Sequence, residues 1–394
     1  MTSVNLLDVL MVCVRGALAA QRYIALQLLQ LDQLQTDTNP QIAEMSIVQY
    51  DAGTRRALLA KLRDAVQVEV KEHLHNKKGN AAKDLVTTAD VVTQAVLECV
   101  LRTAFPTVPF TLVGEEEGST AAQHTRMGAA QCIATHYNTH EAIPQQAELE
   151  AHVPLSSRIV TAKTSEELRR RVGVFIDPID GTNCFVEGCW EVPLTLVGIT
   201  LDGVPIAAVV NRVFHCNAEQ LREGYSSSRS LSYVWNRSTE KPFIVHEGKR
   251  VSPLVSAPRP VTTWSTLRVV CSNTTRDSVF TQLLCKLQPF EKHGARGAGN
   301  KLMLIFSSMI SGSSQRTSCD VFLSPANSIK TWDTCAPHAF LLALGGELYT
   351  LQGEVIRYQL IGDRRTKLPA GVVGVSCWSK TEVPRRMRWS HSNM

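Results

Sequence analysis

Carboxylates in several separate stretches of this sequence could act together on bound metal ions. They are Asp90 in VTTAD, Glu115 and Glu116 in VGEEE, Asp177 and Asp180 in FIDPIDGTN, and Asp333 in KTWDTCAP. Hard divalent cations such as Mg²⁺ bind several oxygen ligands, and a fold gathers such ligands from distant segments. In this order along the chain, the set predicts a site for more than one magnesium ion, of the kind that phosphatases use.

Each stretch alone also has an ordinary structural interpretation. Residues 115–117 are typical of a solvated acidic turn, and residues 177–182 are rich in turn-forming Asp, Pro and Gly. Asp90 fits the first turn of a helix, where the helix dipole favours an acid, and Asp333 fits a helix cap. The prediction of a metal site therefore depends on the combination and not on any one stretch.

Composition sets the frame for these motifs. The 394 residues allow two domains or one bilobal unit, and 44% of them are hydrophobic, enough for a sizeable core. The net charge of +5, from 41 basic and 36 acidic residues, is too small to indicate a nucleic-acid partner. The 11 cysteines form no Cys-X-X-Cys pair, which indicates reduced thiols and argues against a disulfide framework or a zinc site.

Targeting and membrane signals are weak. The apolar N-terminus carries Asp8 and Arg15, unlike a signal peptide, and no uncharged apolar run reaches the roughly 18 residues of a membrane span. We therefore expect no membrane association and a cytoplasmic location. The C-terminal Ser392-Asn393-Met394 is a degenerate version of a peroxisomal address, so a peroxisome-like organelle is the alternative.

The elements that must position the acids can be predicted from the spacing of apolar residues. Helical spacing predicts helices at 5–35, 55–75 and about 90–104. Thr87 or Thr88 would cap the last of these. Short apolar runs predict strands at 109–113, 172–176, 192–200 and 205–213. Asp202-Gly203 between the last two strands is a strong hairpin signal, and residues 118–168 are predicted to be a long, partly helical insertion.

A second unit begins near residue 265. Its predicted elements are a strand at 267–271, a helix at 275–287, a loop at 294–301, a helix at 302–309 and a strand at 321–325. A last helix should begin near Asp333 and end at Gly345-Gly346, because Gly commonly follows a helix end. Such elements predict the α/β class with two layered lobes, in which the carboxylates collect at strand ends and helix starts.

We expect the two lobes to differ in size and content. Residues 1–264 should form a larger α+β lobe with a mainly antiparallel sheet, which includes the insertion and carries most metal ligands. Residues 265–394 should form a smaller α/β lobe, which carries the substrate-binding residues and the Trp-Asp metal ligand.

The motifs together resemble a known family. Asp, Glu-Glu, Asp-Pro-Ile-Asp-Gly-Thr and Trp-Asp follow one another, and eleven residues separate Asp333 from Gly345-Gly346. This four-part pattern, over roughly residues 80–350, resembles the inositol monophosphatase superfamily of magnesium-dependent, lithium-sensitive phosphatases. The resemblance implies a layered α-β-α-β-α sandwich, a phosphomonoesterase activity inhibited by Li⁺, and two to three bound Mg²⁺ ions.

The resemblance also implies a role for each residue of the motifs. One Mg²⁺ would be held by Glu115, Asp177 and the backbone carbonyl of Ile179. A second would be held by Asp177, Asp180 and Asp333, with Asp177 as the bridge between the two ions. Glu116 would support the first ion, and a third ion would lie near Glu115.

Two further roles concern the phosphate and the attacking water. The backbone N–H groups of Gly181 and Thr182, at a helix start, would bind phosphate oxygens. The Thr182 hydroxyl would hydrogen-bond Asp90, and this pair would orient or deprotonate the water. Asp90 and Thr182 are therefore the predicted catalytic residues.

The substrate is predicted from the amino-acid sequences of two motifs. Residues 332–337 (WDTCAP) and 297–301 (GAGNK) resemble the branch of inositol polyphosphate 1-phosphatases and 3'(2'),5'-bisphosphate nucleotidases. Substrates of both enzymes carry two phosphates, so a cationic site is needed for the phosphate that is not cleaved. By analogy the substrate pocket would be lined by Thr274, Arg276, Gly297, Ala298, Lys301 and Ser328, with Lys301 and Arg276 as its cations.

We expect removal of the 1-phosphate from inositol polyphosphates such as inositol 1,4-bisphosphate, which the chain length, the insertion and Arg276 favour. Asp-Gly-Thr at 180–182 and the two motifs above favour the alternative, a nucleotidase acting on 3'-phosphoadenosine 5'-phosphate. A catalytically silent inositol phosphate-binding protein is a further alternative, against which the complete ligand set argues. The expected partner is a small phosphorylated molecule, and both a monomer and a homodimer are open.

Overall fold

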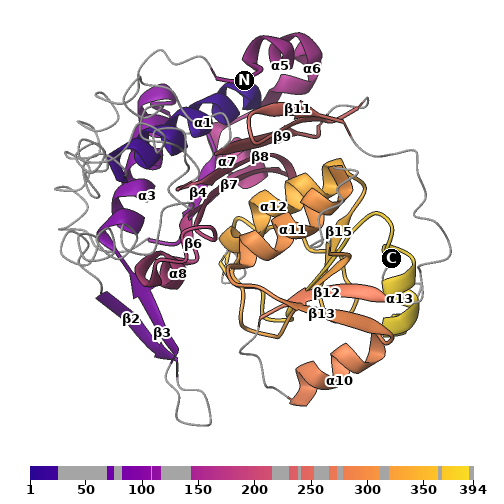
Figure 1. Cartoon of the computed structure of the whole chain (residues 1–394). Coiled ribbons are helices and arrows are strands. Elements are labelled where there is room, and N and C mark those ends of the chain that lie inside the picture. The colour runs from indigo at the N-terminus through magenta and orange to yellow at the C-terminus, as the bar shows by residue number, and fades with distance from the viewer. Residues whose placement is uncertain are drawn as a thin grey trace, which may run out of the picture.

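The computed structural model describes residues 1–24, 69–74, 82–107, 109–116, 143–214, 230–237, 241–252, 266–272, 278–310, 319–362 and 366–389. Within these residues, two large β-sheets alternate with three pairs of helices (Figure 1). Three clusters of buried hydrophobic side chains fill the spaces between the layers. The α-β-α-β-α sandwich predicted from the sequence is therefore confirmed.

The larger sheet has seven strands in the order β11-β10-β9-β8-β7-β6-β4. They are β4 (Thr111–Gly114), β6 (Val172–Asp180), β7 (Leu194–Leu201), β8 (Val204–Arg212), β9 (Leu231–Trp235), β10 (Phe243–His246) and β11 (Lys249–Val251). All neighbours are antiparallel except β4 and β6, which are parallel. The sheet is thus mainly antiparallel, as predicted for the first part of the chain.

Helices α1 (Leu6–Arg22) and α3 (Thr88–Ala104) cover one face of the larger sheet. Leu10 of α1 and Leu97 of α3 share one buried cluster with sheet residues such as Val174. Both helices were predicted from their apolar spacing. The rest of the first predicted helix, from residue 25, lies outside the described residues.

The smaller sheet has five strands in the order β13-β12-β14-β16-β15. They are β12 (Leu267–Cys271), β13 (Phe290–Gly294), β14 (Val321–Ser324), β15 (Glu347–Tyr349) and β16 (Val372–Val375). The pairs of β12 with β13 and with β14 are parallel, whereas the pairs of β16 with β14 and with β15 are antiparallel.

Two helices fill the space between the sheets, and two cover the outer face of the smaller sheet. The inner pair is α11 (Ala298–Ile310) and α12 (Thr331–Ala343), and the outer pair is α10 (Ser278–Lys286) and α13 (Glu382–Met387). Helix α12 buries residues on nearly every side, as expected for a helix between two sheets. It begins and ends where the sequence predicted.

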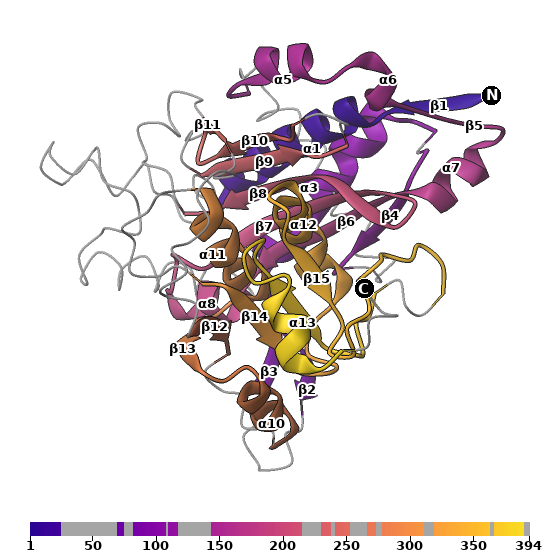
Figure 2. The same cartoon turned by 90° about the vertical axis from the view of Figure 1, so that its right-hand side faces the viewer.

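Two antiparallel ribbons and four short helices complete the described part. They are β1 (Thr2–Asn5) with β5 (Ile159–Ala162), β2 (Glu69–Leu74) with β3 (Ala82–Val86), α5 (Gln146–His152), α6 (Leu155–Arg158), α7 (Ser165–Arg171) and α8 (Thr182–Glu187). The β1–β5 ribbon lies beside α6 and α7 (Figure 2). The described part of the predicted insertion, residues 143–168, is therefore partly helical as expected, with β5 in addition.

The helix predicted at 55–75 is wrong where the structure describes it. Residues 69–74 form strand β2, which pairs with β3 with a register shift between Val70 and Glu72. Helix propensity is a weak preference, and the ladder of hydrogen bonds to a neighbouring strand overrides it here. Residues 55–68 lie outside the described residues.

The hairpin predicted around Asp202-Gly203 is confirmed. Leu201 of β7 pairs with Val204 of β8, and the two residues between them have φ values of 51° and 78°. Two successive residues with positive φ are typical of the tight turn whose twist matches a hairpin.

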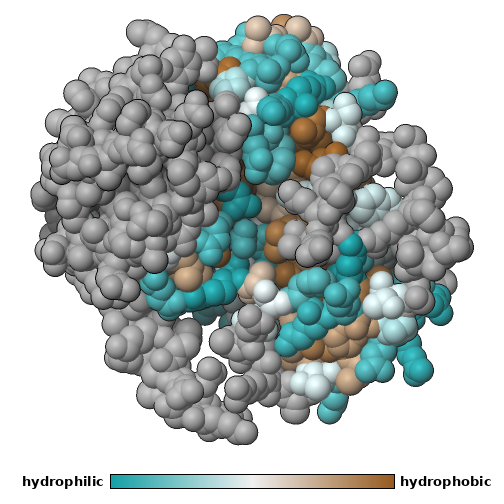
Figure 3. All heavy atoms as spheres, in the orientation of Figure 1, coloured by the Kyte–Doolittle hydropathy of each residue, from teal (hydrophilic) through white to brown (hydrophobic). Residues whose placement is uncertain are grey.

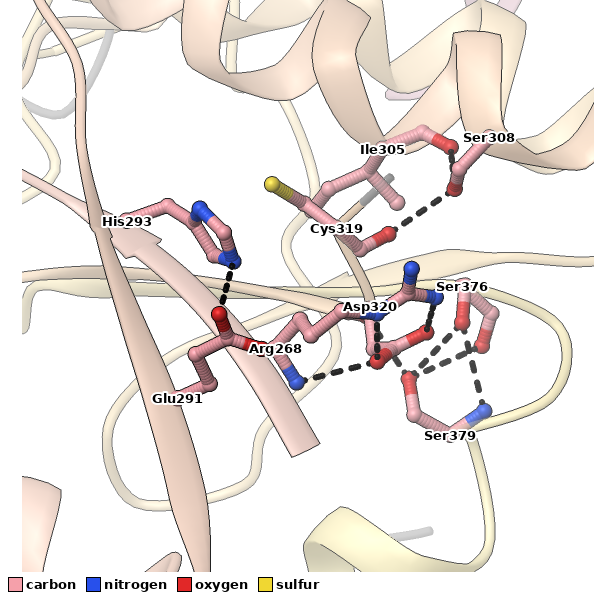
Figure 4. A network of polar contacts seen from close by, with 9 residues as sticks. All are labelled: Arg268, Glu291, His293, Ile305, Ser308, Cys319, Asp320, Ser376 and Ser379. Carbon is pink, nitrogen blue, oxygen red and sulfur yellow. Dashed lines mark hydrogen bonds and ion pairs between the residues drawn. The ribbon is translucent and has the colours of Figure 1, made fainter. Parts of the chain in front are cut away.

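A buried acid braces the smaller sheet. Asp320 accepts hydrogen bonds from the backbone N–H of Arg268 at 2.9 Å and from its guanidinium at 3.2 Å (Figure 4). The Asp320 carbonyl accepts from the Ser379 hydroxyl at 2.8 Å and from the Ser376 N–H at 2.9 Å. These bonds tie the starts of β12 and β14 to the segment that follows β16.

In the part of the chain that the structure describes, no helix is both long and apolar enough to cross a bilayer. The boundary predicted between residues 264 and 265 lies outside the described residues.

Gly198 of β7 lets α12 approach the larger sheet closely. A Cβ atom at this position would lie 2.4 Å from the Cys335 sulfur and 2.8 Å from the Ala336 nitrogen. Real Cβ atoms essentially never come so close to backbone, so only glycine allows this packing. Since Asp333 is in the first turn of α12, this contact also sets how near that turn lies to β6 and β7.

We expect Gly198→Ala to destabilise the protein by about 1–3 kcal/mol, because the added methyl group overpacks the contact with α12. Urea unfolding at equilibrium measures the change. Where space is available, replacing Gly by Ala in a strand stabilises by roughly 0.5–1 kcal/mol. An unchanged or increased stability would therefore contradict the close packing.

Candidate metal centre and active site

Three of the predicted carboxylates come together on the side of the larger sheet that faces α11 and α12. One oxygen each from Asp177, Asp180 and Asp333 lies within 4.8 Å of the other two. The residues Asp177 and Asp180 are only 1% and 5% exposed. Among the described residues, this is the one group of three potential metal ligands that are so close. In Figure 3, hydrophilic and hydrophobic residues are mixed across the middle of the face.

A β-bulge brings Asp177 and Asp180 to the same side of β6. The strand continues through the Asp-Pro-Ile-Asp motif, beyond its predicted end at residue 176. Asp177 lies opposite Leu196 and Asp180 opposite Leu194, so β6 has one extra residue here. In a regular strand, residues three apart point to opposite faces, and the extra residue corrects this. The Thr195 hydroxyl donates to the Pro178 carbonyl at 2.9 Å and fixes the bulge.

The start of α11 holds the Asp180 carboxylate. Its Oδ1 accepts from the Ala298 N–H at 2.9 Å and its Oδ2 from the Asn300 N–H at 3.2 Å. The helix therefore begins inside the glycine-rich segment, four residues before its predicted start at 302. Gly297 has a φ of 70°, and a Cβ there would lie 2.8 Å from Asp180 Oδ2. Gly297 and Ala298, which were predicted to line the substrate pocket, thus also support a predicted metal ligand.

Asp90 and Asp333 are positioned by the same kind of hydrogen bond at the start of a helix. Each is the third residue of its helix, α3 or α12, and each accepts a backbone N–H from the residue before the helix. Asp90 Oδ2 accepts from Thr87 at 2.8 Å, and Asp333 Oδ2 accepts from Lys330 at 2.7 Å. This capping-box geometry fixes one oxygen of each carboxylate and directs the other into the site.

Thr182 connects Asp90 to the end of β6. Its hydroxyl lies 2.9 Å from Asp90 Oδ1 and 3.1 Å from the Ile179 carbonyl. The hydroxyl has one proton to donate, and its remaining lone pair is free to accept a proton from another molecule. Gly181 precedes it with a φ of 90°, in the left-handed region that favours glycine. The hydrogen bond between Thr182 and Asp90 that the sequence predicted is present.

The Glu-Glu motif directly follows β4, beside the end of β6. The Glu115 N–H donates to the Ile176 carbonyl at 3.1 Å, which sets Glu115 next to Asp177 across the parallel pair. The charge of Glu115 acts on Asp90, Asp177 and Asp333 alike. Glu117, the third acid of the run, lies outside the described residues.

Gln94 is a site residue that the sequence analysis missed. It is 3% exposed, and its side-chain oxygen accepts the Glu116 N–H at 2.8 Å. Gln94 lies four residues after Asp90, and residues i and i+4 share one face of a helix. That spacing from a predicted catalytic acid was the available signal. A Cβ on Gly114 would lie 2.3 Å from the Gln94 amide, so the turn is packed directly on this side chain.

Burial and mutual repulsion raise the pKa values of these carboxyl groups. Burial raises the pKa of Asp90 to about 7, although the Thr87 hydrogen bond opposes it. Burial, followed by the charges of Asp180 and Glu115, raises the pKa of Asp333 to about 7. The pKa of Asp177 lies well above its usual range, because of burial first and Glu115 next. A cluster of this kind favours protonation unless a cation neutralises it.

The residues of the cluster fit a magnesium ion. The buried Oδ1 of Asp177 has no hydrogen-bond partner in the described part of the chain. Leaving a buried acceptor unsatisfied costs about 1–3 kcal/mol, and a bound cation would remove both this cost and the repulsion. The donors are all hard oxygens, which suit Mg²⁺, whereas softer metals prefer nitrogen or sulfur.

Lys301 lies close to this cluster. The residue is 9% exposed, and its ammonium nitrogen lies 5.6 Å from the centroid of the Phe322 ring. Burial lowers the pKa of Lys301, and the nearby Asp180 charge partly opposes that shift. The charges of Lys301 and Asp180 therefore influence each other, and the role of Lys301 in binding a phosphate stays a prediction.

Of the other predicted pocket residues, the structure describes Ser328. The Ser328 hydroxyl donates to the Pro325 carbonyl at 2.6 Å and pairs with the Ser324 hydroxyl at 2.7 Å, so its hydrogen bonds are already made locally. Thr274 and Arg276 lie outside the described residues. Their part in a substrate pocket stays a prediction.

A comparison of the sequence with models of protein families assigns this layered fold and its carboxylates to a known family. The model of the inositol monophosphatase family matches residues 42–389, so this chain belongs to the inositol monophosphatase family.

Individual relatives of the chain share only a low sequence identity with it. The 3'(2'),5'-bisphosphate nucleotidase 1 of Dictyostelium discoideum is 30% identical over 186 residues, which are 47% of this chain and 54% of that protein. The chain thus spans about half the length of that relative. Human inositol polyphosphate 1-phosphatase is 24% identical over 72% of this chain and 75% of its own. A staphylococcal inositol monophosphatase structure aligns over 91% of this chain and 95% of its own, with a TM-score of 0.49 and 15% identity.

Removing divalent ions should make the protein less stable as the pH rises. The raised pKa values of Asp90 and Asp333, about 7 against 3.8, mean that their protonated forms stabilise the fold fully below about pH 4. That stability is lost as the pH rises through about 7. In EDTA, the thermal midpoint should therefore fall from about pH 5 to about pH 8.

Mg²⁺ should reverse this loss. A concentration one hundredfold above the Kd stabilises by about 2.7 kcal/mol, and the rise in thermal midpoint should be larger at about pH 8 than at about pH 5. Differential scanning fluorimetry, with NaCl at matched ionic strength as the control, measures both effects. No Mg²⁺-dependent rise at the higher pH would contradict the metal assignment.

Proposed function

We propose that this protein is a magnesium-dependent phosphomonoesterase acting on small phosphorylated molecules. The observation that carries the proposal is the cluster of the buried Asp177 and Asp180 with the half-buried Asp333, beside the hydrogen-bonded pair of Asp90 and Thr182. The cluster supplies ligands for cations that bind phosphate, and the pair supplies a proton acceptor next to them. Membership of the inositol monophosphatase family supports the same activity.

The metal ligands in this proposal come from three elements. Glu115, Asp177 and the Ile179 carbonyl would hold one Mg²⁺, and Asp177, Asp180 and Asp333 a second, with Glu116 in support and a third ion near Glu115. Bound Mg²⁺ supplies charge that polarises the phosphate and lowers the pKa of a water molecule.

Asp90 and Thr182 would remove the proton of the attacking water. The Thr182 hydroxyl donates to Asp90 Oδ1, which leaves a lone pair of the hydroxyl oxygen for the water. As the water attacks phosphorus, the bond from phosphorus to the ester oxygen of the substrate would break, the water proton would pass to the Thr182 oxygen and the hydroxyl proton would pass to Asp90. The released ester oxygen would take up a proton from solvent. A pKa of about 7 allows Asp90 to accept this proton near neutral pH.

The first candidate substrate is an inositol polyphosphate such as inositol 1,4-bisphosphate, from which the 1-phosphate would be removed. Lys301 supports a substrate with a second phosphate, because the charge of Asp180 offsets only part of the cost of burying the ammonium group and a phosphate would offset more of it. In this proposal the N–H groups of Gly181 and Thr182 bind the phosphate that is cleaved.

The second candidate is 3'-phosphoadenosine 5'-phosphate, which also carries two phosphates. The Dictyostelium nucleotidase favours it, because that protein has a higher identity to this chain than the human inositol polyphosphate 1-phosphatase, although over a shorter segment. The chemistry at the carboxylates is the same for both candidates.

Phosphate release from the two substrates, side by side at millimolar Mg²⁺, tests the proposal. We expect release from inositol 1,4-bisphosphate to be the faster reaction and to be inhibited by millimolar Li⁺. Preference for the nucleotide would overturn the first candidate and leave the phosphatase proposal intact. If neither these nor other bisphosphates are cleaved, the chain is a silent relative and the proposed function is wrong.

Asp90→Asn should lower kcat by about 10²–10⁴-fold, because the amide cannot accept the proton, while the affinity for Mg²⁺ changes little. Thr182→Ala should lower kcat as well, whereas Thr182→Ser, which keeps the hydroxyl, should retain most of the activity. Steady-state kinetics with a Mg²⁺ titration measures all three variants. An Asp90→Asn enzyme with nearly normal kcat would show that the pair does not handle the proton.

A further inference from the structure

A chain of buried, hydrogen-bonded polar groups runs along one face of α12, and none of its members has a role in the chemistry described above. His338 Nε2 lies 2.8 Å from Glu347 Oε1, and His338 Nδ1 lies 3.2 Å from the Tyr358 hydroxyl. The Tyr358 hydroxyl donates to the Thr334 hydroxyl at 3.0 Å, which lies 3.2 Å from the Thr331 carbonyl. The polar chain thus begins at β15 and ends in the first turn of α12.

The side chains of this polar chain are almost completely buried. His338 and Thr334 are 0% exposed, Tyr358 is 1% exposed and Glu347 is 8% exposed. Burying such groups is costly unless every one finds a partner, so a complete chain specifies one arrangement of its members. The outer end is closed by Lys380, whose ammonium lies 3.8 Å from Glu347 Oε2.

The contacts of Tyr358 join two successive turns of one helix. Thr334 and His338 are four residues apart, so both lie on the same face of α12, and the Tyr358 hydroxyl bonds to both. The Tyr358 backbone is held in turn, because its N–H donates to the Gly203 carbonyl in the β7–β8 hairpin at 3.0 Å. The hydroxyl therefore ties the first turn of α12 to the larger sheet.

That turn carries Asp333, whose carboxylate accepts fewer backbone N–H groups than that of Asp180, the predicted metal ligand at the end of β6. Two backbone N–H groups of α11 hold Asp180, whereas one, from Lys330, holds the Asp333 carboxylate. The position of Asp333 thus depends on the position of its turn. Gly198 limits that turn on one side, and the polar chain that ends at Thr334 and Thr331 limits it on another.

We propose that Tyr358, His338 and Thr334 are positioning residues for the metal centre, which hold the first turn of α12 so that Asp333 faces Asp177 and Asp180. The inference rests on the proposed function, because it presumes that the cluster binds a divalent ion. Partners that orient a ligand typically change metal affinity or activity by about 10–100-fold when they are removed.

Binding of Mn²⁺, followed by electron paramagnetic resonance of the free ion, tests this directly and needs no turnover. Tyr358→Phe should weaken Mn²⁺ binding by about tenfold. Tyr349→Phe is the matched control, since Tyr349 is also buried but lies in β15 on the outer side of the smaller sheet. In kinetics, Tyr358→Phe should raise the Mg²⁺ concentration for half-maximal activity and leave the KM for substrate at saturating Mg²⁺ unchanged.

A second pair of variants decides the question if Tyr358→Phe does not fold. Thr334→Val removes the hydroxyl at nearly constant shape and should weaken Mn²⁺ binding, whereas Thr334→Ser keeps the hydroxyl and should bind nearly as tightly as the natural protein. If Thr334→Val and Thr334→Ser bind Mn²⁺ equally tightly, or if Tyr358→Phe binds it as tightly as the natural protein does, the inference is wrong and the proposed function still stands. If the natural protein itself binds no Mn²⁺, both are wrong.

Discussion

Oxygens of Asp177, Asp180 and Asp333 lie within 4.8 Å of one another, where Asp177 and Asp180 are buried and Asp333 is half-buried. Like charges at that distance repel strongly when solvent does not screen them, and burial adds the cost of desolvation. A protein can hold such a cluster only if its backbone forces the side chains together and if a cation or protons neutralise them. Much of the described structure can be understood as the means of forcing them together.

Each carboxylate is fixed by a different piece of backbone. A bulge at Pro178–Ile179 turns Asp177 and Asp180 to one face of β6, and the start of α11 holds the Asp180 oxygens. Asp90 and Asp333 each use one carboxylate oxygen to cap their own helix. Because these elements are a strand of the larger sheet, helix α3 on one face of that sheet and helices α11 and α12 on the other, three adjacent layers of the sandwich form the scaffold of the site.

The parts of this arrangement that depend on local sequence could be predicted, and the parts that depend on distant pairing could not. The hairpin at Asp202-Gly203 and the Thr87 cap followed from residue types in one short stretch. The bulge did not, because the register of β6 is set by β7. Gln94 was missed because an amide on a helix acquires its role only when the turn after β4 packs on it. The proximity of Tyr358 and Thr334 likewise exists only in the folded chain.

Crystals grown with Mn²⁺, with anomalous diffraction recorded at the manganese absorption edge, would test the central claim most directly. We predict an anomalous peak between the carboxylates of Asp177, Asp180 and Asp333, and its loss in an Asp177→Asn variant that keeps the fold. Well-ordered carboxylates with no peak among them at millimolar Mn²⁺ would contradict the claim that this cluster is a metal centre.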